Sequence, residues 1–79
     1  MKNLKRVPLY RNIWSQIRHW QYITETSDEA LARSLDIHSV RTLKDYDSDP
    51  QNITLSKLDN FLLVNNLTLQ SLISFSTNM

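Results

Sequence analysis

Arg41 and Lys44 have the spacing of two cations that can contact a polyanion together. They lie three residues apart, so on a helix they share one face. In the major groove of DNA such side chains bind guanine or hold phosphate. The neighbours that can add contacts to base edges or thymine methyl groups are Ser39, Val40 and Thr42. The alternative for the two cations is a solvated pair balanced by Asp45 and Asp47. The alternative for Ser39, Val40 and Thr42 is a helix cap and residues at the edge of the core.

A second group of cations opens the chain, where Lys2, Lys5 and Arg6 have no acidic neighbour. Each phosphate that such residues neutralise releases counterions, which favours binding to nucleic acid. We expect residues 1–7 to form a flexible basic arm with this role. An arm without function is the alternative.

The acidic residues oppose a role in DNA binding. All eight lie between residues 25 and 59, against four bases, which leaves that segment at −4. Those expected near the DNA-facing surface are Asp28, Asp45, Asp47 and Asp49. A duplex repels such a surface, whereas a basic protein surface attracts it. The second hypothesis is therefore that this acidic surface binds a basic regulator protein and contacts the DNA-binding domain of that regulator.

Two aromatic residues, Trp14 and Tyr22, are predicted to lie off the apolar stripe of the first helix. Exposed aromatic side chains are enriched at protein interfaces, so both are candidates for protein contact. The alternative is that they cover the ends of the chain. Phe75, near the end of the chain, is a candidate contact for a homodimer.

Several functions are not expected from this composition. The chain has no cysteine and no glycine, so thiol chemistry and glycine-rich phosphate loops are absent, and a reducing, cytoplasmic setting is compatible with it. His19 and His38 have no partners at metal-ligand spacing. We expect no enzymatic activity, no metal and no cofactor. No apolar run reaches the length of a membrane span, and the basic start has no apolar stretch behind it, as a secretory signal would.

The apolar periodicity predicts an all-α fold of five helices. The first follows Pro8 and runs to about Thr24. A short helix follows, capped either by Thr26, with Glu29 in a capping box, or by Ser27, and it ends near Asp36. The third, at about 39–46, is the candidate reading helix. Its expected inward residues are Val40 or Leu43, and Tyr46. The buried face of the first helix is predicted to hold Leu9, Ile13, Ile17, Trp20 and Ile23.

The second half of the chain is predicted to hold a loop and two helices. The loop covers residues 47–52, and the helices are capped by Thr54 and Thr68. Their expected buried residues are Leu55, Leu58, Phe61 and Leu62, then Leu69, Leu72, Ile73 and Phe75. Without glycine, left-handed backbone positions should fall to Asn and Asp, with Asn65-Asn66 as one such stop. We expect one domain over residues 8–75 and a frayed tail over 76–79.

From Ile17 to Ile73 the chain resembles the Cro and phage-repressor type of helix-turn-helix domain, the XRE family. The matching positions are Ile17 and Trp20, Ser27, Leu31-Ala32, Leu35-Asp36-Ile37, Ser39 with Thr42-Leu43, Tyr46, Pro50, Thr54, Leu58, Phe61, Leu62, Leu67-Thr68-Leu69 and Leu72-Ile73. The chain departs from the family pattern where Asp36 replaces a turn glycine, His38 lengthens the turn by one residue, and Asp28 and Thr26 replace a polar and an apolar residue.

The resemblance implies a compact bundle of the lambda-repressor-like helix-turn-helix type, and a transcription regulator, such as a repressor, that reads double-stranded DNA with residues 39–46. Some phage antirepressors are similar in fold and bind a regulator protein instead. The resemblance therefore leaves both partners open, with a homodimer as a further expectation because such regulators commonly pair on palindromic sites.

Overall fold

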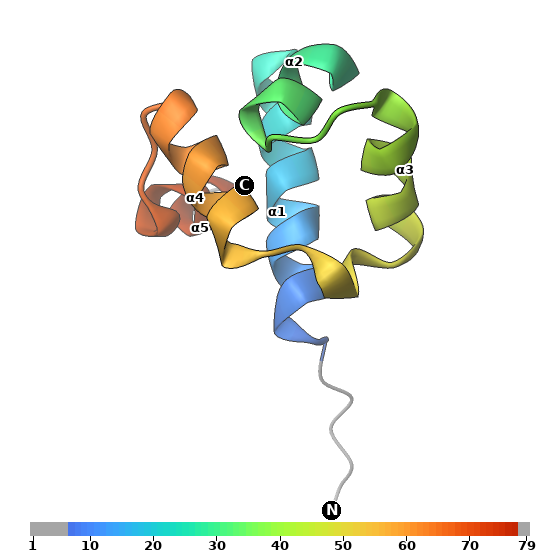
Figure 1. Ribbon diagram of the computed structural model, residues 1–79. Coiled ribbons are helices and arrows are strands. Elements are labelled where there is room, and N and C mark those ends of the chain that lie inside the picture. Colours follow the sequence, from blue (N-terminus) through green and yellow to red (C-terminus); the bar gives the residue numbers. More distant parts are fainter. Residues whose placement is uncertain (1–6, 78–79) are drawn as a thin grey trace, which may run out of the picture.

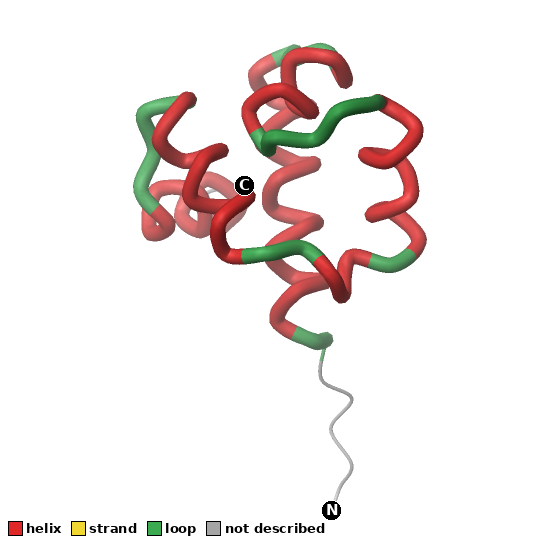
Figure 2. The backbone as a smooth tube through the Cα atoms, viewed as in Figure 1, coloured by secondary structure: helices red, strands yellow, loops and turns green. Residues whose placement is uncertain are grey.

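The computed structural model describes residues 7–77, with side chains described as far as Ser74. Within this range the chain is all-helical, without a strand (Figures 1 and 2). The elements are α1 (Leu9–Thr24), α2 (Asp28–Ser34), α3 (Val40–Ser48), the 3₁₀ helix η1 (Pro50–Asn52), α4 (Leu55–Val64) and α5 (Leu69–Thr77). The prediction of an all-α fold with five α-helices is confirmed for the described part of the chain.

Side-chain caps set the start of three helices. Ser27, Ser39 and Thr54 each accept a hydrogen bond from the backbone N–H three residues on, at 3.1 Å. Ser27, and not Thr26, is therefore the cap of α2. Thr68 and Ser71 bond each other reciprocally at the start of α5, with N–H to oxygen distances of 2.9 and 3.0 Å.

Some element ends differ from the prediction. α2 ends at Ser34 rather than near Asp36, and α3 continues to Ser48, so Asp47 lies on a helix and not in a loop. α5 reaches Thr77, beyond the predicted start of the tail at Ser76. These differences are of one or two residues, the usual uncertainty of helix ends.

Between residues 7 and 77, three residues take the left-handed conformation in place of glycine. Asp36 and Asn66, with φ of 58° and 56°, agree with the prediction that Asp and Asn fill these positions. Glu25, with φ of 57°, departs from that prediction because it is neither Asp nor Asn. The N–H groups of Glu25 and Thr26 bond the carbonyls of Tyr22 and Gln21 in this conformation, and these bonds close the end of α1 and offset the strain.

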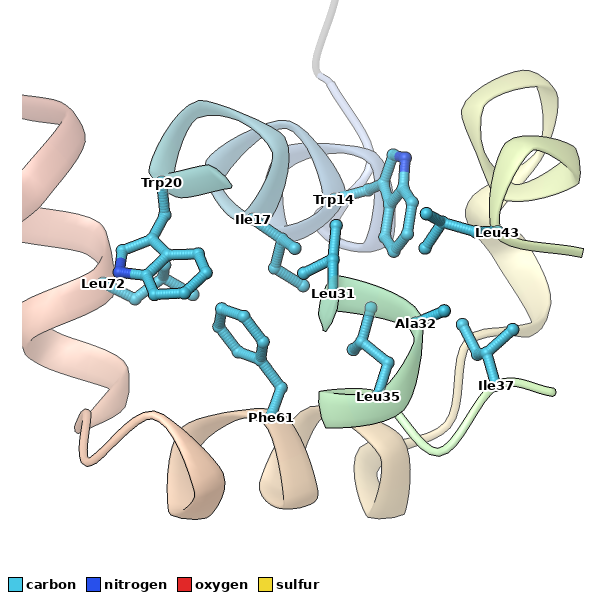
Figure 3. Packing of buried hydrophobic residues seen from close by; sticks show 10 residues of the cluster. All are labelled: Trp14, Ile17, Trp20, Leu31, Ala32, Leu35, Ile37, Leu43, Phe61 and Leu72. Carbon is cyan, nitrogen blue, oxygen red and sulfur yellow. The ribbon is translucent and has the colours of Figure 1, made fainter. Parts of the chain in front are cut away.

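The core lies between α1 and the helices that surround it (Figure 3). Trp20 of α1 meets Phe61 of α4 edge to face, with ring centroids 5.0 Å apart. Ile17, Leu31, Leu35, Leu43, Phe61 and Leu72 are fully buried. α1 lies between α3 on one side and α5 on the other (Figure 1).

The predicted buried faces of three helices need correction. Trp14 is only 3 % exposed and packs against Tyr46 of α3, with ring centroids 5.4 Å apart, so its predicted exposure is wrong. α1 is central and contacts both α5 and η1, so its buried arc is wider than a single stripe. The residues predicted to be buried but found exposed are Leu9, Ile23, Leu55, Leu69 and Ile73. Four of them lie at or next to a helix end, whereas Ile73 lies in the middle of α5.

Candidate functional site

The turn between α2 and α3 is anchored on both sides. Leu35 and Ile37 are buried, and the Ile37 N–H donates to the Ala32 carbonyl at 2.8 Å. Two side chains of α4 bind the backbone here: Lys57 Nζ donates to the Asp36 carbonyl at 3.0 Å, and Asn60 Nδ2 to the Ser34 carbonyl at 2.8 Å. This longer, glycine-free turn is therefore fixed to the body of the protein.

The α3 helix has one buried face and one exposed face. Leu43 is fully buried and Tyr46 is half-buried against Trp14. Arg41, Lys44 and Asp45 are exposed, and their spacing of three and four residues places them on one face. Arg41 and Lys44 form no ion pair or hydrogen bond with another described residue. Both cations are therefore available to an external anion.

The polar residues at the start of α3 are committed to capping. Ser39 Oγ accepts from the Thr42 N–H and also donates to Thr42 Oγ1, both at 3.1 Å. Val40 is half-buried. Ser39 is exposed, but its hydroxyl is already engaged in the cap, and Val40 is less accessible to a ligand than Arg41 and Lys44.

A cluster centred on Arg18, which we name the Arg18 cluster, ties α1 to α2 and α3. Its members are Arg18, Trp14, Gln21, Asp28 and Asp47. Arg18 Nε and Nη2 bind the two carboxylate oxygens of Asp47 at 2.9 and 2.8 Å, and Nη1 binds Asp28 Oδ1 at 3.0 Å. Trp14 Nε1 donates to Asp47 at 2.8 Å, and Gln21 Nε2 to Asp28 at 2.7 Å. The guanidinium carbon also lies 5.7 Å from the centroid of the Trp14 ring.

These bonds keep both acids of the Arg18 cluster ionised. The hydrogen bond from Gln21, followed by that from Arg18, lowers the pKa of Asp28 below its usual value. The hydrogen bonds from Arg18 and then Trp14 lower the pKa of Asp47. In turn, the hydrogen bond to Asp47 raises the pKa of Arg18. One cation therefore pairs with two of the four acids that oppose DNA binding, which leaves these three side chains with a net charge of −1.

Arg11 provides a further link between α1 and α3. It donates to the Ser48 carbonyl at 3.0 Å and to the Asp47 carbonyl at 3.4 Å. A cation at the C-terminus of a helix is favourable, because the unpaired carbonyls there carry partial negative charge. Arg11 and Arg18 thus hold α3 in place.

The remaining candidate residues divide into three groups. Tyr22 is 80 % exposed, as predicted, whereas the burial of Trp14 removes it as an exposed contact for a partner. Asp49 Oδ1 caps η1 by accepting from the Gln51 N–H at 3.1 Å. Lys2, Lys5 and Arg6 lie outside the described residues.

The described residues hold no group of three or more His, Asp or Glu side chains that could bind a metal ion. None of the described helices combines the length and apolar character that crossing a membrane requires. Comparison of the chain with family models, curated proteins and solved structures gives no match. The function is therefore inferred from the site alone.

Proposed function

We propose that this protein is a helix-turn-helix transcription regulator that binds double-stranded DNA, with α3 in the major groove. The observation that carries the proposal is the pairing of Arg18 with both Asp28 and Asp47. Without this pairing, two uncompensated carboxylates would lie at the start of α2 and near the end of α3, where they would repel phosphate.

The local balance of charge supports this reading. Residues 28–48 hold five acids and three bases, a sum of −2. Arg11 and Arg18 of α1 fold against this segment and bring the sum to zero. On the exposed face of α3, Asp45 adjoins Arg41 and Lys44, and Lys44 also interacts electrostatically with Asp28 and Asp47.

The chemistry of that face suits the major groove. Arg41 has the donors to bind O6 and N7 of guanine together, and Lys44 is a point charge for phosphate or guanine. Thr42 is exposed and offers a methyl group for thymine. By sequence, Lys2, Lys5 and Arg6 would add contacts to phosphate.

Binding of the full chain to a pool of random-sequence duplexes tests the proposal. We expect binding at low salt, and enrichment of a preferred sequence through rounds of selection. Arg41→Ala should weaken binding to the selected duplex by roughly 1–3 kcal/mol and relax its preference at one base pair. The matched control is Arg33→Ala, which removes an equally exposed arginine on α2 and should leave the preference intact. Unchanged affinity and preference in Arg41→Ala would contradict a reading role for α3.

Binding to a basic regulator protein is the second candidate function. The exposed Tyr22, which lines a surface hollow with Glu25 at the end of α1, favours it, and so does the exposed Asp45 of α3, because exposed aromatic and acidic side chains suit a basic protein surface. Asp45→Lys separates the two candidates. It should strengthen duplex binding if α3 contacts DNA, and break the protein complex if the acidic face is the contact.

A further inference from the structure

The α3 helix has few apolar contacts that hold it in place. Of its nine residues Leu43 alone is buried, while Val40 and Tyr46 are half-buried. Apolar burial has no direction, so these contacts fix the position of the helix more than its angle. The angle of α3 therefore depends on directional bonds near its two ends. Arg11 and Arg18 of α1 provide such bonds at the end of the helix.

Two side chains of α4 bind the backbone that leads into the start of α3. Lys57 Nζ donates to the Asp36 carbonyl over 3.0 Å, and Asn60 Nδ2 donates over 2.8 Å to the carbonyl of Ser34, the last residue of α2. Asp36 has a left-handed φ of 58°, which a residue other than glycine keeps only where its surroundings fix it. The two bonds therefore fix the path of the chain from α2 to α3.

α4 is a firm base for these two bonds. Phe61, the residue after Asn60, is fully buried and meets Trp20 of α1 edge to face (Figure 3). Lys57 lies three residues before Asn60 and four before Phe61, so the three side chains share one side of α4, and α4 contacts α2. The same packing that buries Phe61 thus holds the two donors against the turn.

We propose that Lys57 and Asn60 are positioning residues that set the sequence preference of α3, although both belong to another helix. This inference rests on the proposed binding of DNA by α3. Arg41 binds O6 and N7 of one guanine only where both hydrogen bonds form together, which requires a fixed helix angle. A contact to phosphate tolerates more movement, because it depends mainly on charge. Loss of the α4 bonds should therefore weaken sequence preference more than affinity for duplex DNA in general.

Fluorescence anisotropy with two labelled duplexes of equal length tests the proposal. One duplex carries the sequence selected from the random pool and the other a random sequence, and the measured quantity is the ratio of the two affinities. Asn60→Leu keeps much of the side-chain shape without the donor, and should lower this ratio by about threefold to tenfold through weaker binding of the selected duplex. Lys57→Met should lower the ratio likewise, whereas Lys57→Arg keeps a donor and should retain most of it.

Two controls separate positioning from stability and from net charge. Leu62→Ala shortens a half-buried side chain of α4 that packs against the core, so it should lower stability and leave the ratio as in wild type. Arg33→Met removes a positive charge at an exposed position of α2 and should weaken binding to both duplexes equally. Amide hydrogen exchange gives a measurement without DNA: exchange at residues 37–42 should be faster in Asn60→Leu than in Leu62→Ala.

Circular dichroism checks that each variant remains helical, and the pair Lys57→Met and Lys57→Arg carries the test if Asn60→Leu does not fold. A wild-type preference that is unchanged in Asn60→Leu and Lys57→Met would overturn this inference and leave the proposed function intact. An equal loss of the ratio in Leu62→Ala would also overturn it, because the effect would then come from stability. Absence of any duplex binding by wild type at low salt would instead overturn the proposed function, and this inference with it.

Discussion

Both sides of α1 pack apolar side chains, with Leu43 and the Trp14–Tyr46 contact on the α3 side, but the two sides differ in their polar bonds. On the α3 side, Arg11 and Arg18 make directional bonds to the ends of α2 and α3. On the α4 and α5 side, Phe61 and Leu72 pack against Trp20. Apolar burial contributes free energy without fixed direction, whereas charged hydrogen bonds fix geometry at a smaller net gain. We infer that apolar packing on the α4–α5 side mainly stabilises the fold, whereas the polar bonds of Arg11 and Arg18 on the other side fix the orientation of α3.

Substitution of Phe61 should have the largest effect on the free energy of unfolding. Phe61→Ala removes a fully buried ring and should lower the free energy of unfolding by about 3–5 kcal/mol, a large part of the stability of a small domain. Urea unfolding followed by circular dichroism measures the change. Leu63→Ala, exposed on the same helix, should change it by about 0.5 kcal/mol or less. A loss below about 1 kcal/mol in Phe61→Ala would place the stabilising core elsewhere.

Removal of the positive charge of Arg18 should have an intermediate effect on the free energy of unfolding. Arg18→Met keeps the aliphatic stem but leaves Asp28 and Asp47 without their cation. We expect a loss of about 1–2 kcal/mol in the free energy of unfolding, moderated because both carboxylates are partly exposed. Arg33→Met, at an exposed position of α2, is the control and should change little. Equal effects of the two substitutions would show that the cluster has no special role.

Low pH should remove the contribution of the Arg18 cluster to the free energy of unfolding. The pKa values of Asp28 and Asp47 are lowered in the folded state, so this state binds fewer protons than the unfolded chain near pH 4. Their contribution to stability is complete above about pH 5 and is lost as the pH falls through the folded pKa values. Thermal unfolding from about pH 7 to pH 3 should therefore bring wild type and Arg18→Met together. A constant difference between them would contradict the pKa directions.

The smallest expected effect concerns Asp45, the acid that adjoins Arg41 and Lys44 on the exposed face of α3. Asp45→Asn should raise affinity for duplex DNA by about two- to fivefold at low salt, because one phosphate-repelling charge is lost. Asp59→Asn is the matched control, with the same chemical change at an exposed position of α4. Fluorescence anisotropy with a labelled duplex measures both. An equal gain in the two variants would indicate only an effect of net charge.

Local signals in the sequence predicted the helices well. Ser27, Ser39 and Thr54 cap helices through bonds that span three residues, and such short-range patterns can be read without the fold. Asp36 and Asn66 likewise take the left-handed positions that glycine would fill. The family resemblance to a helix-turn-helix domain remains a prediction.

Long-range pairing was the part that the sequence did not predict. Asp28 and Asp47 lie 10 and 29 residues from Arg18, so nothing in the local pattern pairs them. From the sequence alone, Asp28 and Asp47 are therefore expected to be free charges that repel phosphate. Trp14 was placed wrongly for a similar reason, because a single apolar stripe cannot represent a helix that has neighbours on several sides.

Mapping the contact on the protein tests whether α3 is the DNA-binding surface. Backbone amide shifts of the labelled full chain can be followed by nuclear magnetic resonance during titration with a duplex at about 50 mM salt, where phosphate contacts are strong. If α3 lies in the major groove, we expect salt-sensitive shifts concentrated at residues 39–45, with α5 unchanged. No shifts, or shifts confined to α4 and α5, would contradict DNA binding by α3.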